Sequence, residues 1–167
     1  MTSHELFATM PTALASEIID FNLTTDKPIY RAALDAVAQS RRVRLVFMER
    51  MSRDERHNMM LASLARPHLN LAADGLIRNW LLKKHSSLLI DFLNALGIPH
   101  DKGVVESLPK LVPDDHLHNA VNTLLDKHPA AAVAVYLHAF NSMNDESWAN
   151  LDTLLQSESR LHFRREG

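Results

Sequence analysis

A chain of 167 residues can bury a sizeable core, and its length is typical of a single domain. It contains no cysteine, which excludes disulfides, a catalytic thiol, iron–sulfur clusters and zinc sites built on thiolates. Its formal net charge of −2 gives no overall attraction toward nucleic acid or an anionic membrane.

Neither a membrane span nor a secretory signal is evident in the sequence. No run approaches the roughly 18 consecutive apolar residues that a transmembrane helix needs. The N-terminal stretch MTSHELFATMP lacks the basic region and the following apolar core of a signal peptide. We therefore expect a cytoplasmic protein.

Apolar residues recur at helical spacing along most of the chain, and only four glycines are present. Scarce glycine suits helices joined by short connections rather than many β-turns. We therefore expect an all-α fold, in which seven or eight helices pack as antiparallel hairpins in a single domain over residues 1–167. Residues 1–10 and 160–167 are expected to fray.

The first helix is expected over residues 11–20, because a proline at position 11 suits a first helical turn. Residues 22–27 form a polar connection that contains candidate N-cap residues. An apolar stripe over residues 28–38 predicts the second helix. Residues 43–51 alternate in part like a strand, but no second strand is evident to satisfy their backbone groups, so we assign a helix there.

Ser52 and Glu55 have the spacing of a capping box, which predicts the start of the next helix. That helix carries Met60, Leu61 and Leu64 toward the core and ends near Pro67.

The longest apolar-periodic segment in the chain runs from residue 69 to residue 96. It predicts two packed helices that meet near His85, and Gly97 ends the second helix as a C-cap glycine would. Trp80 and Leu81 are expected in the core. Replacing Leu81 with alanine would then be strongly destabilising.

The remaining helices are predicted from their start signals. Residues 98–113 form a connection of mixed character. Pro113 and the two acids after it begin a helix, because first-turn acids complement the helix dipole. Pro129 begins another, and residues 144–146 begin the last. The apolar residues named for the helix after Pro129 are Val133, Tyr136, Leu137 and Phe140.

The sequence contains one internal similarity, in which residues 79–85 (NWLLKKH) match residues 122–128 (NTLLDKH) at five of seven positions. The spacing is compatible with a repeated helical hairpin, and chance similarity between two amphipathic helices is the alternative. In a true repeat, His85 and His128 would mark equivalent helix breaks. There the histidines would serve the exposed helix carbonyls, and a paired functional site is the alternative.

Ten histidines raise the question of metal binding, because histidine is the commonest metal ligand. Asp54 and His57 are three residues apart on one predicted helix, and Asp115 and His118 repeat that spacing on another. Each pair shares a helix face, but the chain has no Glu-x-x-His, the motif of dimetal helical bundles. The alternative is that the acids complement helix N-termini while the histidines are solvated.

His100 and Asp101 form the dipeptide of the HD phosphohydrolases, helical enzymes that bind metal through this pair, a distant histidine and a distant aspartate. The resemblance is two residues long, and the pair falls in a predicted connection rather than within a helix, so we do not assign the family. Taken together, the candidate motifs in the sequence predict no catalytic residue, no cofactor and no bound metal. The candidate ligands, should a metal bind, are His57, His100, Asp101, Asp115 and His118.

Six arginines lie between residues 41 and 56, against three acids, so this segment carries a local charge of +3. A phosphate-rich partner could use such a surface. The alternative is an exposed face with intrahelical ion pairs, and no glycine-rich phosphate loop accompanies the cluster. Its members are Arg41, Arg42, Arg44, Arg50, Arg53 and Arg56.

No catalytic constellation is evident, so we expect a non-enzymatic protein-interaction module that binds a protein partner or self-associates. No membrane partner is expected, and the charge argues against nucleic acid. The alternatives are a metal-dependent enzyme that draws histidine and aspartate ligands from its helices, and a regulator that binds a small ligand between helices. An exposed apolar patch, converging histidines or an enclosed cavity would distinguish these three classes.

Overall fold

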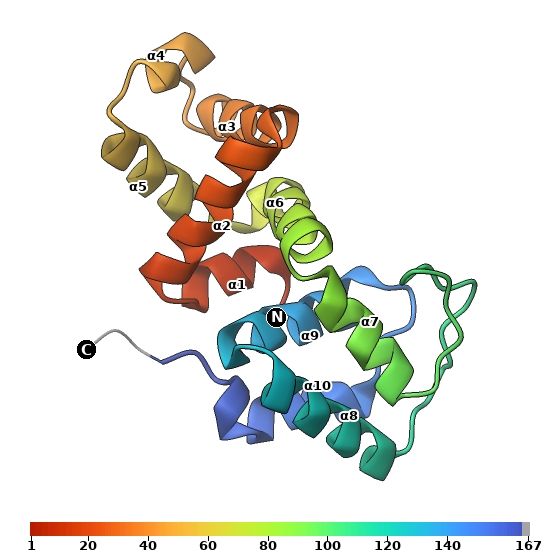
Figure 1. Ribbon diagram of the computed structural model, residues 1–167. Helices are drawn as coiled ribbons and strands as arrows, with labels where there is room; N and C mark the ends of the chain where they lie inside the picture. The colour runs from red at the N-terminus through yellow and green to blue at the C-terminus, as the bar shows by residue number, and fades with distance from the viewer. Residues whose placement is uncertain (165–167) are drawn as a thin grey trace. The chain divides into compact units, whose positions relative to one another are not determined.

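The computed structural model describes residues 1–164, which fold into helices without a strand among them, so the all-α class is confirmed. These residues form ten α-helices and two short 3-10 helices, more than the seven or eight expected (Figure 1). The difference includes α1 (Ser3–Thr9), a helix too short to show a clear apolar period. Within the described part, no helix has the length and apolar character needed to cross a membrane.

The chain divides into two compact units, although its length predicts one domain. Unit 1 comprises residues 1–80 and unit 2 comprises residues 81–163. The boundary falls inside α6 (Asn70–Lys84), so one helix contributes residues to both units. Of the tail for which we expect fraying, residues 160–167, the last three lie outside the described residues, whereas Leu161 is buried in the 3-10 helix η2 (Ser159–Leu161).

Unit 1 begins with α1, in the segment for which we expect fraying. A capping interaction starts this helix, because the Glu5 carboxylate accepts hydrogen bonds from the backbone N–H and the hydroxyl of Thr2 at 2.7 and 3.0 Å. Leu6 is fully buried. The cap and the buried leucine together explain why the helix forms so close to the chain end.

The expected connection over residues 22–27 is instead helical, because α2 (Thr12–Thr25) continues almost to α3 (Lys27–Ser40). The hydroxyl of Thr25 donates to the carbonyl of Phe21, so the polar residue is satisfied inside the helix. Only Asp26 separates the two helices. Its carboxylate accepts a hydrogen bond from the backbone N–H of Ile29 and caps α3.

The next helices of unit 1 agree more closely with the sequence. The run 43–51 contains α4 (Leu45–Glu49), and the Ser52 side chain caps α5 (Arg53–Leu64) by accepting from the Glu55 N–H at 3.3 Å. A short 3-10 helix, η1 (Pro67–Leu69), leads into α6. The fully buried side chains of unit 1 include Leu6, Ile18, Ile19, Leu34, Met48, Met60, Leu64, Leu76 and Ile77.

Unit 2 is built around α9 (Ala130–Met143). It also contains α7 (Ser86–Ala95), α8 (Asp114–Lys127), α10 (Ala149–Ser157) and η2 (Ser159–Leu161). Helix α7 packs against α8, and α10 packs against α9. Residues 132–140 are all buried, so burial on α9 extends beyond the four apolar residues that the sequence identified. The cause is tertiary, since neighbours cover this helix on every side along these residues.

Four aromatic rings form the centre of unit 2. Phe92 meets Tyr136 and Phe140 edge to face, with ring centroids 5.5 and 5.3 Å apart. Trp148 lies 5.0 Å from Phe140 and donates its indole N–H to the carbonyl of Pro109 at 2.8 Å. The cluster thus also holds the connection between α7 and α8. The last helix begins later than expected, at Ala149, because Trp148 is its N-cap residue.

The two similar segments break at matching positions. Helix α6 ends at Lys84 and α7 begins at Ser86, while α8 ends at Lys127 and α9 begins at Ala130. The backbone turns differently at the two breaks, since ψ is 32° at His85 and 156° at His128. Pro129 disfavours helical geometry at the residue before it, whereas a serine imposes no such limit. The segments share a break position but not a turn.

Candidate interaction surface on the short helix α4

The predicted metal ligands do not assemble into one site. Asp115 and His118 are exposed on α8, and His57 belongs to unit 1 while the other candidates belong to unit 2. Among residues 1–164, no group of three or more histidine, aspartate or glutamate side chains is placed to hold a metal ion.

The His100–Asp101 pair belongs to a local turn in the connection after α7. The backbone N–H of Gly103 donates to His100 Nδ1 at 3.0 Å, and His100 Nε2 lies 2.7 Å from the amide oxygen of Asn94. Both ring nitrogens are therefore engaged. Asp101 is exposed, and its backbone pairs with that of Val104. The pair shapes the loop, as its position outside any helix suggests.

We expected His128, which ends α8, to bond an exposed helix carbonyl, but its Nε2 does not. That nitrogen lies 2.8 Å from a carboxylate oxygen of Asp91 on α7. The contact links two packed helices, so its position reflects tertiary packing rather than capping.

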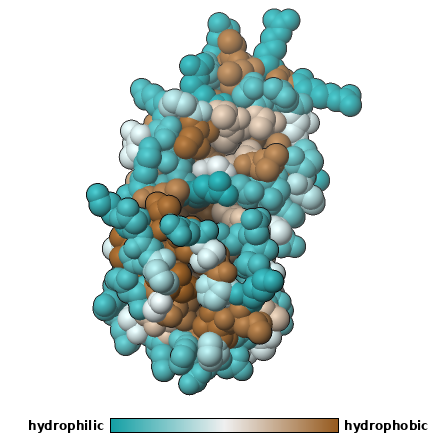
Figure 2. All heavy atoms as spheres, turned by 90° about the vertical axis from the view of Figure 1, so that its right-hand side faces the viewer, coloured by the Kyte–Doolittle hydropathy of each residue, from teal (hydrophilic) through white to brown (hydrophobic). Residues whose placement is uncertain are grey.

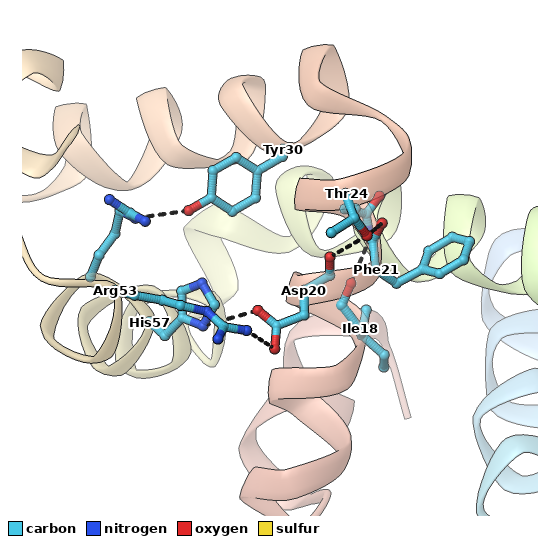
Figure 3. Close-up of polar contacts among 9 residues, drawn as sticks. Ile18, Asp20, Phe21, Thr24, Tyr30, Arg53 and His57 are labelled. Atoms are coloured by element: carbon cyan, nitrogen blue, oxygen red, sulfur yellow. Dashed lines mark hydrogen bonds and ion pairs between the residues drawn. The ribbon is translucent and has the colours of Figure 1, made fainter.

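His57 is buried on α5 and faces α2 rather than its predicted neighbour Asp54, which is exposed. Its Nδ1 lies 3.5 Å from Oδ1 of Asp20, while Arg53 forms an ion pair with Oδ2 of the same carboxylate (Figure 3). Burial lowers the pKa of His57 below its ordinary value, and Asp20 opposes that shift. The three side chains hold α5 against α2.

A second set of contacts holds the end of α4. The Arg56 guanidinium donates to the Tyr30 hydroxyl at 3.0 Å, and also to the backbone carbonyls of Glu49 and Met51 at 3.4 and 3.5 Å. These carbonyls lie where a helix ends without intrahelical donors. Arg31 on α3 forms an ion pair with Glu49 at 3.1 Å. Side chains of α3 and α5 therefore fix the position of α4.

Helix α4 turns one side chain fully inward and two outward. Met48 is completely buried, whereas Val46 and Phe47 are 53% and 56% exposed. Neighbouring residues on a helix point about 100° apart, so a helix this short cannot bury all of its apolar residues against one neighbour. The other large apolar side chains exposed within residues 1–164 do not adjoin one another in sequence; they are Leu71, Leu82, Val104 and Leu111.

Within residues 1–164, the six arginines of the cluster fall into two groups, three whose side chains bond other helices and three whose side chains do not. Arg41 donates to the Ser63 hydroxyl at 2.8 Å, and Arg53 and Arg56 make the contacts described above. These contacts run between helices, so the alternative of intrahelical pairs does not describe them. Three arginines remain exposed, with no side-chain hydrogen bond or ion pair to any of residues 1–164. They are Arg42, Arg44 and Arg50.

Arg42 occupies a backbone position that usually favours glycine. Its φ is +58°, and it follows α3, where the N–H of Val43 bonds the carbonyl of Ala38 at 3.0 Å and its own N–H bonds that of Gln39 at 3.1 Å. A left-handed conformation costs a residue with a side chain roughly 1–2 kcal/mol. The fold thus accepts a local cost to carry an arginine here.

Val46 and Phe47 with the three unpaired arginines Arg42, Arg44 and Arg50 are called the α4 surface. In Figure 2, the upper part of the view, which contains the end of unit 1 with α3 and α4, shows hydrophobic atoms among protruding hydrophilic side chains. Sequence reasoning missed the apolar pair, because the alternation over residues 43–51 does not show which side chains turn inward. The short length of the segment was the signal that could have identified the pair, because so short a helix cannot bury all of its apolar side chains.

No protein-family model, curated protein or solved structure matches this chain.

Proposed function

We propose that the chain is a non-enzymatic protein-interaction module that binds a protein partner through the α4 surface. The observation that carries the proposal is the adjacent exposed pair Val46 and Phe47, close in sequence to three arginines whose side chains have no hydrogen bond or ion pair to residues 1–164. Interfaces between proteins combine an apolar centre with a polar rim, and aromatic and arginine side chains contribute most to their affinity.

The type of basic side chain in this part of the sequence, arginine rather than lysine, supports a protein partner. Between residues 28 and 82 every basic residue other than histidine is arginine, and no lysine occurs. Arginine is enriched and lysine depleted where proteins meet, since the planar guanidinium is more weakly hydrated and forms paired hydrogen bonds.

The rigidity of the support adds to the case. Met48 anchors α4 in the core, while Arg56 and Arg31 hold its C-terminal end. A surface held in place loses less conformational freedom on binding, which favours affinity.

Site-specific photo-crosslinking tests the proposal. Phe47 is replaced by p-benzoyl-phenylalanine in the full chain produced in its native cells, and Leu71, which is 85% exposed on α6, is replaced in the same way as a control. We expect a defined protein adduct at position 47 and not at position 71. The purified partner should then bind the unmodified chain and lose binding to Phe47→Asp. Absence of an adduct at position 47, or equal adducts at both positions, contradicts the proposal.

A further inference from the structure

We infer that the partner of the α4 surface is an acidic amphipathic segment of another protein, one that carries apolar side chains beside carboxylates. This inference rests on the proposed function and adds the chemistry of the partner. The evidence is that two exposed apolar side chains, Val46 and Phe47, are flanked along the chain by arginines that have no ion pair with residues 1–164.

The apolar pair defines the middle of the contact. Val46 and Phe47 are adjacent in sequence and more than half exposed, and Arg44 and Arg50 flank the helix as its N-cap and C-cap residues. A partner that covers the pair must bring apolar side chains to it. Because α4 is only five residues long, the matching partner element is a short segment rather than a broad face.

The charges define the rim. Arg42, Arg44 and Arg50 have no ion pair within the described part of the chain, whereas Glu49 is already engaged by Arg31. A guanidinium without a partner binds a carboxylate through two parallel hydrogen bonds. The partner side chains that satisfy this rim are aspartate and glutamate.

Other polyanions fit these charges less well. Asp54 and Glu55 are exposed in the first turn of α5, within the arginine-rich segment and a few residues after Arg50. A nucleic acid or an anionic membrane would place phosphates against these two carboxylates, and a nucleic-acid backbone offers nothing apolar to Val46 and Phe47. A segment with a few well-placed carboxylates avoids both problems.

Selection from a displayed library of random peptides of about 16 residues tests the inference, because a length of this order suffices for a groove-binding segment. The full chain serves as the target, and the triple variant R42E/R44E/R50E serves for counter-selection. We expect enrichment of peptides that combine leucine or phenylalanine with aspartate and glutamate. Their dissociation constants should rise about ten-fold or more for Phe47→Asp and for the triple variant.

Matched controls come from α6, where Leu71→Asp and Arg78→Glu change an exposed leucine and an exposed arginine outside the α4 surface. These variants should keep the affinity of the wild-type chain. Raising the salt concentration from about 0.05 M to about 0.5 M should weaken peptide binding, because it screens exposed charges. Far-UV circular dichroism and melting temperatures establish that every variant folds.

The outcomes separate the two proposals. Enriched peptides that are neutral or basic, yet lose affinity for Phe47→Asp, overturn the acidic partner and leave the α4 surface as a docking site. If no peptide is enriched whose binding depends on the α4 surface, both proposals are overturned. Binding to phosphatidylserine vesicles or to DNA that is lost in the triple variant, without peptide enrichment, replaces a protein with a polyanion. A doubled mass in analytical ultracentrifugation that Phe47→Asp returns to the monomer identifies a second copy as the occupant and overturns a separate partner.

Discussion

In α9, residues 132–140 are all buried, whereas in α4 Met48 alone of five residues is buried. The first helix lies among other elements and every side chain over these nine positions contributes to packing. The second lies at the edge of unit 1 and is fixed by one methionine and a few polar contacts. The comparison shows that burial must be assigned residue by residue, because Val46 and Phe47 of α4 are exposed while residues 132–140 of α9 form the core.

The largest expected effect tests this contrast between two phenylalanines. Phe140→Ala should lower the free energy of unfolding by about 3–5 kcal/mol, because Phe140 is 7% exposed and contacts Phe92 and Trp148. Phe47→Ala should change it by less than about 0.5 kcal/mol, as surface substitutions do. Denaturant titration of both variants gives the answer. Equal losses would show that Phe47 packs against the fold and is not free for a partner.

A second test uses neighbouring leucines of α6. Leu81 is 8% exposed and Leu82 is 52% exposed. Leu81→Ala should cost about 2–5 kcal/mol, whereas Leu82→Ala should cost less than about 0.5 kcal/mol. The same titration measures both. A small effect at Leu81 would contradict the central role given to the segment from residue 69 to residue 96.

The polar contacts that hold α4 should have an intermediate effect. Arg56→Met keeps an unbranched side chain but removes the hydrogen bonds to Tyr30 and to the carbonyls at the end of α4, so it should cost about 1–3 kcal/mol. Amide hydrogen exchange should speed up over residues 45–51 more than elsewhere. Arg50→Met, at an arginine whose side chain makes no ion pair with residues 1–164, is the control and should leave exchange unchanged. Uniform exchange in the two variants would show that Arg56 does not support α4.

Arg42→Gly should have a smaller effect of opposite sign. Glycine adopts a positive φ readily, and the gain exceeds the greater entropy it loses on folding, so stability should rise by up to about 1 kcal/mol. Binding of an acidic peptide should weaken at the same time, since one guanidinium is lost. Calorimetric melting and peptide titration measure the two changes. A destabilised variant would show that the Arg42 side chain contributes to the fold.

The pH dependence of stability gives the finest distinction, between a buried and an exposed histidine. Burial lowers the folded-state pKa of His57 below its ordinary value of 6.5, so the unfolded chain binds this proton more readily. The free energy of unfolding should therefore fall as the pH drops below about 6.5 toward the folded-state pKa. His57→Gln should reduce this slope, whereas His118→Gln, at an exposed histidine, should retain it. If the free energy of unfolding falls equally steeply with pH in wild type and in His57→Gln, His57 is not the group responsible for the pH dependence.

Much of the fold was predictable because the evidence for it is local. Helical periodicity identified the all-α class and the helices on either side of His85. Pro129 identified the break after α8, and the capping-box spacing identified the cap at Ser52. Other features depend on residues far apart in sequence. Trp148 bonds Pro109 across the connection after α7, and the complete burial of residues 132–140 depends on neighbours that no local pattern reveals.

The candidate site was less predictable than the fold. The arginine cluster was evident, but the sequence could not separate Arg53, which pairs with Asp20 on another helix, from Arg44, whose side chain has no ion pair among the residues that the structure describes. His57 was singled out with Asp54 as its partner, and its partner is Asp20 instead. Spacing along one helix identifies which side chains share a face, but only the packing shows what that face meets.

The contacts of Arg56 and Met48 have a consequence for how this protein can evolve. They secure α4 through the carbonyls of Glu49 and Met51 and a single inward side chain, so among residues 1–164 no side-chain hydrogen bond or ion pair of the α4 surface holds the helix. Substitutions in descendants of this gene can therefore alter the specificity of the surface while the scaffold remains folded. Sequence drift should concentrate at Val46, Phe47 and their arginine neighbours, while Tyr30, Met48 and Arg56 remain under constraint.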